Sequence, residues 1–286
     1  MRAISWCFRD FDNFIAIIDN HLPQTGVNQK FDLPVISYDE FKSKHSKNEC
    51  IICISLYNPD KADEVRKIVR ADGYVSFIHR EIINVKKGQY FDFFHENNLF
   101  VPDEVFVHMG SSDGYNEECF VEHVENKYKK IIAFEPSPFN FEKCKEALVN
   151  LRDCHVVKAG CGDKSGVIKF HEEFTGDLGG YYGSKVSDKG NMEIKIFALD
   201  EYWDEYCKND IVTLIAMDTE GYELKALQGA AGIIKEHKPK LAISIYHKHE
   251  DIYEIPLYIK SLNPDYKLAI RLYGNNFIDD GICYAY

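Results

Sequence analysis

The chain has 286 residues, of which 45% are hydrophobic and 28% are charged, and this composition excludes an intrinsically disordered protein. Its formal net charge of −12 argues against a general affinity for nucleic acid, because neutralising phosphates requires clustered Lys and Arg. Apolar runs are far shorter than a bilayer span, and residues 1–6 lack the pattern of a secretory signal, so we expect no membrane span and a cytoplasmic location.

The first hundred residues alternate short β-rich runs with amphipathic helical stretches. Strands are predicted at residues 34–37, 49–57 and 74–78, and a helix begins at the Asn58-Pro59-Asp60 signal and ends near Gly73. Strands joined by a helix predict a small α/β unit. No glycine-rich turn follows a strand here, so the unit lacks a backbone cradle for phosphates. We expect it to serve in docking, in homo-oligomerisation or in shaping the acceptor site.

Nine cysteines are scattered along the chain, and their odd number does not indicate a disulfide framework. The closely spaced pair Cys50 and Cys53 lies within the predicted strand 49–57 and has no second pair to complete a zinc site. Plain buried thiols are therefore predicted there, the alternative being a redox or metal site.

An aromatic stretch at residues 84–102 is predicted to be helical, and it ends at Val101-Pro102-Asp103. A proline followed by an acidic residue is a strong break in such a pattern. We therefore predict a boundary here, between a small N-terminal α/β unit of residues 1–100 and a main domain of residues 101–286.

From residue 104 onward strands and helices alternate regularly. Predicted strands cover residues 105–109, 130–134, 155–159, 212–217 and 241–246, and predicted helices cover residues 115–126, 138–150 and 222–236. This alternation predicts a doubly wound parallel sheet of the α/β class. At the C-terminus, residues 266–273 and 281–286 predict an antiparallel pair that closes the sheet.

A further hairpin is predicted from residues 167–171 and 192–197, with a long tip rich in glycine between them. The tip carries Tyr181 and Tyr182, whose flat rings suit contact with a sugar, while the glycines permit movement. We therefore predict an acceptor-binding lid. A solvent-exposed loop is the alternative.

Polar residues follow the predicted strands at their carboxyl ends, where ligands bind in doubly wound sheets. The first turn carries Gly110 and Gly114, which allow a ligand to approach the backbone, and a helix N-terminus lies behind it. Glu135, 25 positions after Gly110, ends the next strand, where its carboxylate can accept hydrogen bonds from both ribose hydroxyls. Because the chain lacks G-x-G-x-x-G spacing and any G-K-[ST], an adenosine with a short zwitterionic arm, as in S-adenosylmethionine, fits better than NAD or ATP.

Five segments together resemble the FkbM family of S-adenosylmethionine-dependent methyltransferases. They are FVHMGSSDGYN at residues 106–116, IAFEP at 132–136, AGCGD at 159–163, AMDTEGYELKAL at 216–227 and KPKLAISIYHKHEDIYEIP at 238–256. The first three are generic to class I methyltransferases, and the last two are more specific. The resemblance runs from about residue 104 to the C-terminus. It implies a Rossmann-like class I fold that binds S-adenosylmethionine and methylates a hydroxyl oxygen, often on a sugar or a polyketide-type acceptor.

The resemblance also implies roles by position. The methionine arm of the cofactor is expected at Gly110, Ser111 and Gly114, its ribose at Glu135 and Pro136, and its adenine at Gly162 and Asp163. The main departure is His108, because the family usually has an acidic residue there to position the cofactor's ammonium group. Either Asp113 replaces that acid, or cofactor binding is weakened or lost.

Methyl transfer from a sulfonium to a hydroxyl needs a base beside the reacting atoms. His247 is the predicted base because the ordinary pKa of histidine is near neutral, and Asp218 is its predicted orienter and a further cofactor contact. Glu220 and His249 are predicted to contact the acceptor. Alternatively, Asp218 and Glu220 are helix N-caps, and residues 247–251 form a solvated turn. Asp218 with a neighbouring carboxylate could also bind a divalent metal, but no metal is predicted.

Two readings follow from these residues. The first is an O-methyltransferase acting on a hydroxyl of a sugar, polysaccharide or related glycoconjugate, with a small-molecule or carbohydrate acceptor as its partner. The second, motivated by His108, is a non-catalytic S-adenosyl-binding or scaffold protein of the same fold.

Overall fold

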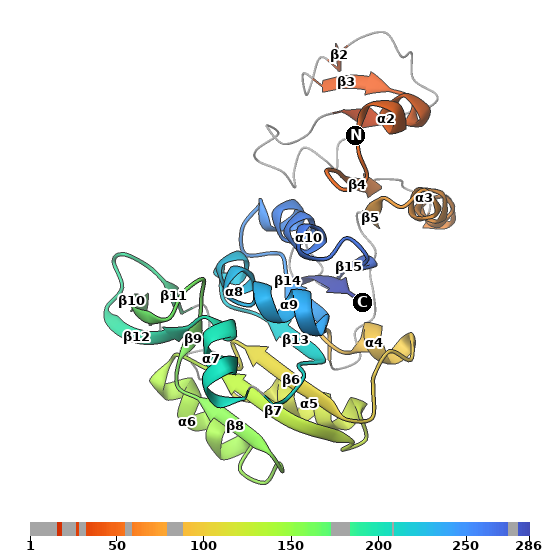
Figure 1. Cartoon of the computed structure of the whole chain (residues 1–286). Coiled ribbons are helices and arrows are strands. Elements are labelled where there is room, and N and C mark those ends of the chain that lie inside the picture. Colours follow the sequence, from red (N-terminus) through yellow and green to blue (C-terminus); the bar gives the residue numbers. More distant parts are fainter. Residues whose placement is uncertain are drawn as a thin grey trace. The chain divides into compact units, whose positions relative to one another are not determined.

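The computed structural model describes residues 16–18, 27–28, 33–54, 59–78, 88–172, 184–207, 209–273 and 280–286. Contacts divide the chain into two compact units (Figure 1). The smaller unit comprises Met1–Glu81 with Asn276–Ile278, and the larger comprises Ile82–Asn275 with Asp279–Tyr286.

The small unit holds two separate sheets. Strands β4 (Ile51–Ile54) and β5 (Val75–Ile78) are parallel and are joined by helix α3 (Pro59–Ala71), so the predicted strand–helix–strand unit is confirmed. The predicted strand at 34–37 also forms, as β3 (Leu33–Ile36), but it lies between β1 (Ile17–Ile18) and β2 (Val27–Asn28) in a sheet of its own. Helix α2 (Tyr38–Lys44) follows it and begins where Ser37 accepts a hydrogen bond from the Glu40 amide.

The large unit is built on a seven-stranded sheet with the order β15-β16-β14-β13-β6-β7-β8. Five adjacent strands are parallel to one another, namely β6 (Glu104–Met109), β7 (Tyr128–Phe134), β8 (Cys154–Val157), β13 (Leu214–Met217) and β14 (Lys240–Ser244). The strand order reverses between β6 and β13, which creates a topological switch point. The sheet therefore places its ligand-binding edge at the carboxyl ends of these two strands.

The predicted C-terminal antiparallel pair is confirmed as β15 (Leu268–Leu272) and β16 (Gly281–Ala285). Strand β16 is antiparallel to both of its neighbours and all five of its residues are buried. This burial explains its continuous apolar sequence.

Helices cover both faces of the large sheet (Figure 1). They are α5 (Tyr115–His123), α6 (Pro138–Ala147), α7 (Leu199–Tyr206), α8 (Glu223–Gly229), α9 (Ala231–His237) and α10 (Asp251–Leu262). Residues 222–236, predicted as one helix, are two, because the backbone leaves helical geometry at Ala230 (φ −110°, ψ 8°). The apolar spacing continues across this break, so periodicity alone could not reveal it.

The aromatic stretch before the main domain belongs to the large unit, although the predicted boundary at residue 100 assigned it to the N-terminal unit. Its helix is short, α4 (Asp92–Glu96), and four of its aromatic residues are almost completely buried: Tyr90, Phe91, Phe93 and Phe94. They pack with Phe106, Phe120 and Tyr284 in one hydrophobic cluster. The Val101-Pro102-Asp103 break separates two elements that share a core.

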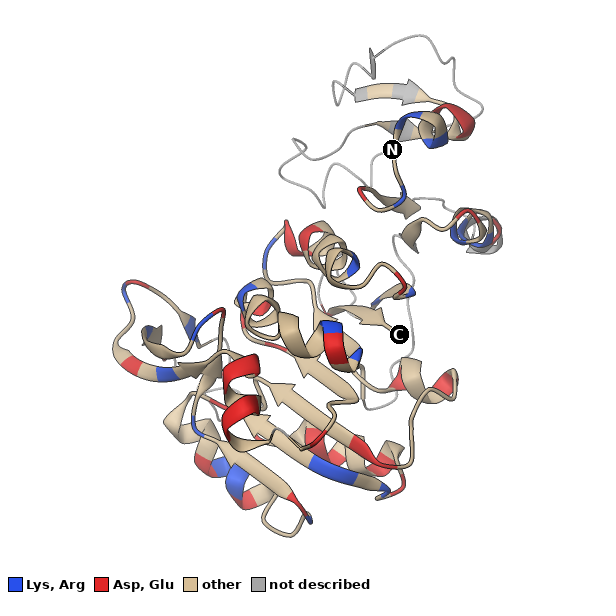
Figure 2. Ribbon diagram, viewed as in Figure 1, with Lys and Arg blue, Asp and Glu red and all other residues tan. Residues whose placement is uncertain are grey.

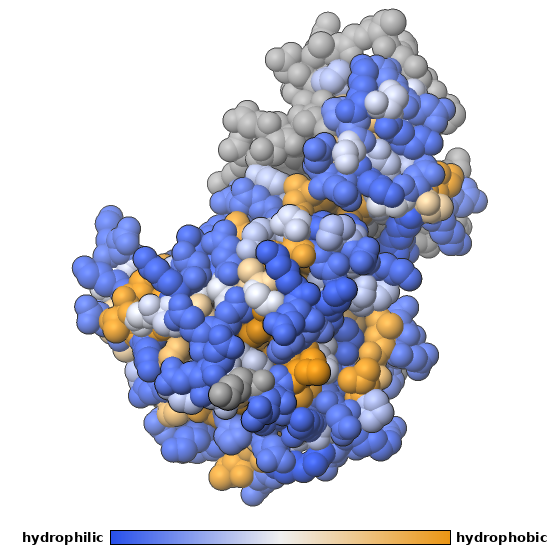
Figure 3. Space-filling view, in the orientation of Figure 1, coloured by the Kyte–Doolittle hydropathy of each residue, from blue (hydrophilic) through white to orange (hydrophobic). Residues whose placement is uncertain are grey.

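A second, small sheet of the large unit has the order β11-β10-β12-β9, formed by β9 (Gly160–Cys161), β10 (Gly166–His171), β11 (Lys185–Val186) and β12 (Met192–Phe197). The predicted hairpin is confirmed, since β10 and β12 pair antiparallel. Tyr181 and Tyr182 of its tip lie outside the described residues. In the described part of the chain, no helix is long and apolar enough to cross a membrane, and the surface seen in Figure 3 is largely hydrophilic.

Candidate functional site

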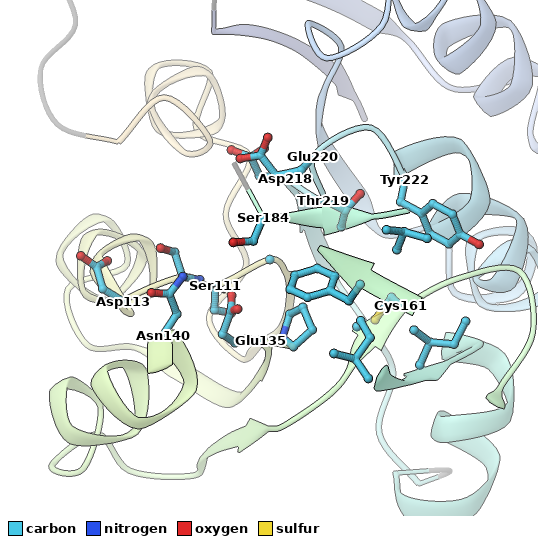
Figure 4. Close-up of a pocket in the computed structure, with 18 of the residues that line it drawn as sticks. Ser111, Asp113, Glu135, Asn140, Cys161, Ser184, Asp218, Thr219, Glu220 and Tyr222 are labelled. Carbon is cyan, nitrogen blue, oxygen red and sulfur yellow. Dashed lines mark hydrogen bonds between the residues drawn. The ribbon is translucent and has the colours of Figure 1, made fainter. Parts of the chain in front are cut away.

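A pocket of about 360 Å³ opens where β6, β7 and β13 end, and the small sheet forms its other wall (Figure 4). Seven of the predicted site residues line it: Gly110, Ser111, Asp113, Glu135, Pro136, Asp218 and Glu220. The structure therefore brings together residues that lie more than a hundred positions apart in the sequence. Other lining residues were not predicted from the sequence, among them Asn140, Ser184, Thr219 and Tyr222.

The glycine turn after β6 is tightly packed against the end of β13. Gly110 has a φ of +94°, and a Cβ on it would lie 1.8 Å from the Asp218 carbonyl oxygen, so no other residue fits there. The amides of Gly110 and Ser111 both donate to the Phe134 carbonyl. Gly114, with φ +90°, precedes α5 and packs on Leu148 away from the pocket. The turn thus brings backbone close to any ligand that lies over the strand ends.

Glu135 links this turn to the end of β7. One carboxylate oxygen accepts from the Ser112 amide and the other from the Ser137 amide, each at 2.8 Å. Burial raises the pKa of Glu135 to about 8, although the two amide hydrogen bonds oppose this. Each carboxylate oxygen has a second lone pair, so the side chain can still accept from a ligand hydroxyl.

His108, the departure from the family pattern, is completely buried within β6. Its Nδ1 lies 2.6 Å from Oε1 of Glu117, on α5, which is also completely buried. Neither residue lines the pocket. His108 is therefore a packed, hydrogen-bonded side chain. Sequence analysis missed its partner, for which an acidic residue in the first turn of the next helix was the available signal.

Asp218 is the hub of a hydrogen-bonded cluster at the end of β13. Its Oδ2 accepts from the hydroxyls of Tyr90, at 2.6 Å, and Tyr246, at 3.0 Å, and its Oδ1 lies 3.3 Å from Nε2 of His247. Burial raises the pKa of Asp218, while His247 and Tyr90 oppose the increase. Tyr90 also contacts Ser244. Sequence analysis missed Tyr90, since nothing in the chain links it to a residue 128 positions away.

His247 lies between carboxylates. Its Nδ1 is 2.9 Å from Oε1 of Glu223, and its Nε2 is 3.4 Å from Oε2 of Glu220 as well as near Asp218. Burial lowers the pKa of His247, but the hydrogen bond and charge of Glu223, with Asp218 and Glu220, raise it to about 9. Conversely, burial raises the pKa of Glu223 and the bond from His247 brings it below its ordinary value. At neutral pH the pair is an imidazolium and a carboxylate.

Asp218, Glu223 and His247 each offer one ligand atom within 4.8 Å of the others, which is a spacing that a metal ion could use. However, both imidazole nitrogens already face carboxylate oxygens at 2.9 to 3.4 Å. A protonated imidazole attracts carboxylates by its charge, so ion pairing accounts for this arrangement.

Three further predicted residues, all in the described part of the chain, do not line the pocket. Asp163 accepts from Lys225 Nζ at 3.0 Å on the surface, and Gly162 packs on Tyr222, while their neighbours Gly160 and Cys161 line the pocket instead. His249 is exposed in the turn before α10. An adenine contact by Asp163 and an acceptor contact by His249 stay predictions.

The sheet order, with one reversed strand beside β14 and a glycine turn after β6, defines a Rossmann-like class I methyltransferase. Residues 105–267 match the profile of the methyltransferase FkbM domain. This match covers more than half of the chain, which belongs to the FkbM family of methyltransferases. No curated protein matches the sequence.

Among the solved structures that resemble this chain, an FkbM methyltransferase has the same fold. The methyltransferase FkbM from Methylobacillus flagellatus is 20% identical with a TM-score of 0.55, over 95% of this chain and 83% of that one. An rRNA methylase from Streptococcus thermophilus is 12% identical with a TM-score of 0.43, over 70% of this chain and 97% of that one. Fibrillarin from Aeropyrum pernix, with bound S-adenosylmethionine, is 11% identical with a TM-score of 0.39, over 65% of this chain and 69% of that one.

The protein is accordingly a methyltransferase, with S-adenosylmethionine as its cofactor. The donor set fits that cofactor, because the pocket combines a glycine turn that allows close approach with a buried carboxyl group, Glu135, at the next strand end. The cofactor supplies an electrophilic methyl group on a sulfonium.

Proposed function

We propose that the protein transfers the methyl group of S-adenosylmethionine to a hydroxyl oxygen of a sugar, polysaccharide or related glycoconjugate. One observation carries the proposal. The predicted cofactor residues Gly110 and Glu135 and the predicted catalytic residue Asp218 border a single pocket, although they come from three different strand ends. Cofactor and acceptor can therefore meet there.

Within this pocket, Glu135 would accept from the ribose hydroxyls, and the turn carrying Ser111 and Asp113 would hold the methionine arm. Four carboxyl groups line the pocket: Asp113, Glu135, Asp218 and Glu220. An acidic lining complements a cofactor that carries a sulfonium and an ammonium group. Asp113 would replace the family's acidic residue at position 108 in binding the ammonium group.

The reading as a non-catalytic protein rested on His108. His108 pairs with Glu117 between β6 and α5 and stays clear of the pocket, so it does not obstruct a cofactor. The missing acidic residue must still be replaced, and Asp113, the predicted substitute, lines the pocket, which supports the catalytic proposal.

Calorimetry with S-adenosylhomocysteine tests cofactor binding. We expect Glu135→Gln to weaken binding by at least about tenfold, the equivalent of about 1.4 kcal/mol for a lost hydrogen bond to the ribose. Glu236→Gln, on the exposed face of α9, is the matched control and should bind as the unaltered protein does. Absence of binding to both S-adenosylmethionine and S-adenosylhomocysteine would overturn the proposal.

The acceptor class requires a second experiment. The full chain is incubated with S-adenosylmethionine labelled in its methyl group and with neutral oligosaccharides, nucleotide sugars and simple polyols in parallel. We expect label to appear in a carbohydrate fraction as an alkali-stable methyl ether. Transfer to an amine or a carboxylate acceptor instead would refute O-methylation while leaving the methyltransferase assignment intact.

A further inference from the structure

Several carboxylates surround His247. Carboxylates approach its ring from the end of β13 (Asp218), from the following turn (Glu220) and from α8 (Glu223). Asp251, at the start of α10, is also close enough to Glu223 to sense its charge. Two tyrosine hydroxyls, from Tyr90 and Tyr246, complete the shell around Asp218.

The accessible side of this cluster belongs to Asp218. Its side chain is 23% exposed and lines the pocket, whereas the His247 side chain is 11% exposed and does not line it. Both nitrogens of His247 lie close to carboxylate oxygens of the protein, Nδ1 at 2.9 Å from Glu223 and Nε2 at 3.3 Å from Asp218. An acceptor hydroxyl in the pocket would therefore meet the Asp218 carboxylate first.

We infer that Asp218 accepts the acceptor's proton and that His247 is a positioning residue, held as a cation between Asp218 and Glu223. This inference rests on the proposed function and reverses the roles predicted from sequence. The raised pKa of His247 agrees with it, because an imidazolium has no lone pair with which to accept a proton.

The reaction then balances without another reagent. A lone pair of the acceptor oxygen forms the O–CH₃ bond as the S–CH₃ bond breaks, and the sulfur keeps the bonding pair to give neutral S-adenosylhomocysteine. The hydroxyl proton passes to Asp218 and later to solvent. Hydrogen bonds from Tyr90 and Tyr246 hold the carboxylate in place, and the positive charge of His247 keeps it ionised until the proton is transferred.

Nuclear magnetic resonance of the full chain, labelled with ¹³C in its histidine rings, tests the charge of His247 directly. His247→Gln identifies the signal. We expect His247 to remain protonated through pH 7.5 and to titrate above pH 8. In Glu223→Gln the midpoint should fall by at least one pH unit, and in Glu236→Gln it should not move. Titration of His247 below pH 7 in the unaltered chain would overturn the inference, as would selective broadening of its signal by added Mn²⁺.

The methyl-transfer assay with labelled S-adenosylmethionine and neutral oligosaccharides tests the roles. Asp218→Asn should lose at least a hundredfold in kcat while its dissociation constant for S-adenosylhomocysteine stays within about threefold. His247→Lys, which keeps the charge, should retain at least ten times the kcat of His247→Gln, whereas a base at position 247 would make both variants equally inactive. Failure of S-adenosylhomocysteine to bind would count against the proposed function, and the titration of His247 would still decide its charge.

Discussion

Glu135 is only 5% exposed, and yet its carboxyl group must interact with a ligand. Burial penalises the charged form, and the two backbone amides of Ser112 and Ser137 only partly compensate. The result is a carboxyl group that is mostly protonated at neutral pH when the pocket holds no ligand. Such a group makes folding stability depend on pH.

The sign of this dependence follows from the two pKa values of Glu135, about 8 in the folded chain and 4.5 ordinarily. Between them the folded state holds a proton that the unfolded state has lost. The contribution of Glu135 to the free energy of unfolding is therefore complete below about pH 4.5. It is lost as the pH rises through 8, by up to about 1.4 kcal/mol per pH unit. His247, with its raised pKa, acts in the same direction.

We expect Glu135→Gln to flatten this decline, because glutamine does not titrate. Urea denaturation at pH 5.5, 7.0 and 8.5 measures the free energy of unfolding. The difference in this free energy between the variant and the unaltered chain should shift in favour of the variant at each step to higher pH. Glu236→Gln should follow the unaltered chain throughout. A constant difference between Glu135→Gln and the unaltered chain across the three pH values would contradict the origin assigned to the shift.

The pair of His108 and Glu117 should affect stability and not binding. Both side chains are fully buried, so removing one leaves a buried polar group without its hydrogen-bond partner, at a cost of about 1–3 kcal/mol. We expect Glu117→Ala to lower the free energy of unfolding by that order, while the fraction that remains folded binds S-adenosylhomocysteine with nearly unchanged affinity. Calorimetry at a temperature below the lowered melting point checks this. A large loss of affinity in the folded fraction would place the pair in the site.

At the scale of elements, sequence patterns predicted most of the large sheet. Apolar runs such as residues 212–217 and the turn between Gly110 and Gly114 are local signals, because strand burial and left-handed turns constrain neighbouring residues. Contacts between side chains that are distant in sequence could not be predicted in this way. The contact of Tyr90 with Asp218 depends on how the segment before β6 packs, and no local pattern encodes it.

That segment also defines where the chain can be shortened. Tyr90, Phe91, Phe93 and Phe94 are each at most 6% exposed, and removing even one buried aromatic side chain costs about 3–5 kcal/mol. We expect a chain that begins at residue 82 to fold and to bind S-adenosylhomocysteine, and a chain that begins at residue 101 to lose its cooperative thermal transition. Circular dichroism melts of both chains test this. A stable, binding-competent chain from residue 101 would show that the aromatic segment is dispensable.

For the molecule as a whole, the formal net charge is −12, and helix α7 carries a concentration of acidic residues (Figure 2). The lining of the pocket is also acidic, because it includes Asp113, Glu135, Asp218 and Glu220. The part of the lining that the structure describes includes no Lys or Arg. Composition alone predicted that phosphate-rich partners are disfavoured. It could not reveal that the acidic residues converge on the site, because that depends on strand order.

This charge should select among acceptors. A bound S-adenosylmethionine offsets about one negative charge, and the remaining carboxylates would repel a phosphate brought beside them, since like charges a few ångströms apart in a partly buried site cost several kcal/mol. We expect neutral oligosaccharides to be methylated with a kcat/KM at least tenfold above that of the corresponding sugar phosphates or nucleotide sugars. Raising the salt concentration should narrow the gap, because added ions screen the repulsion. Equal or better use of the phosphorylated acceptors at low salt would show that cationic side chains outside the described lining complete the site.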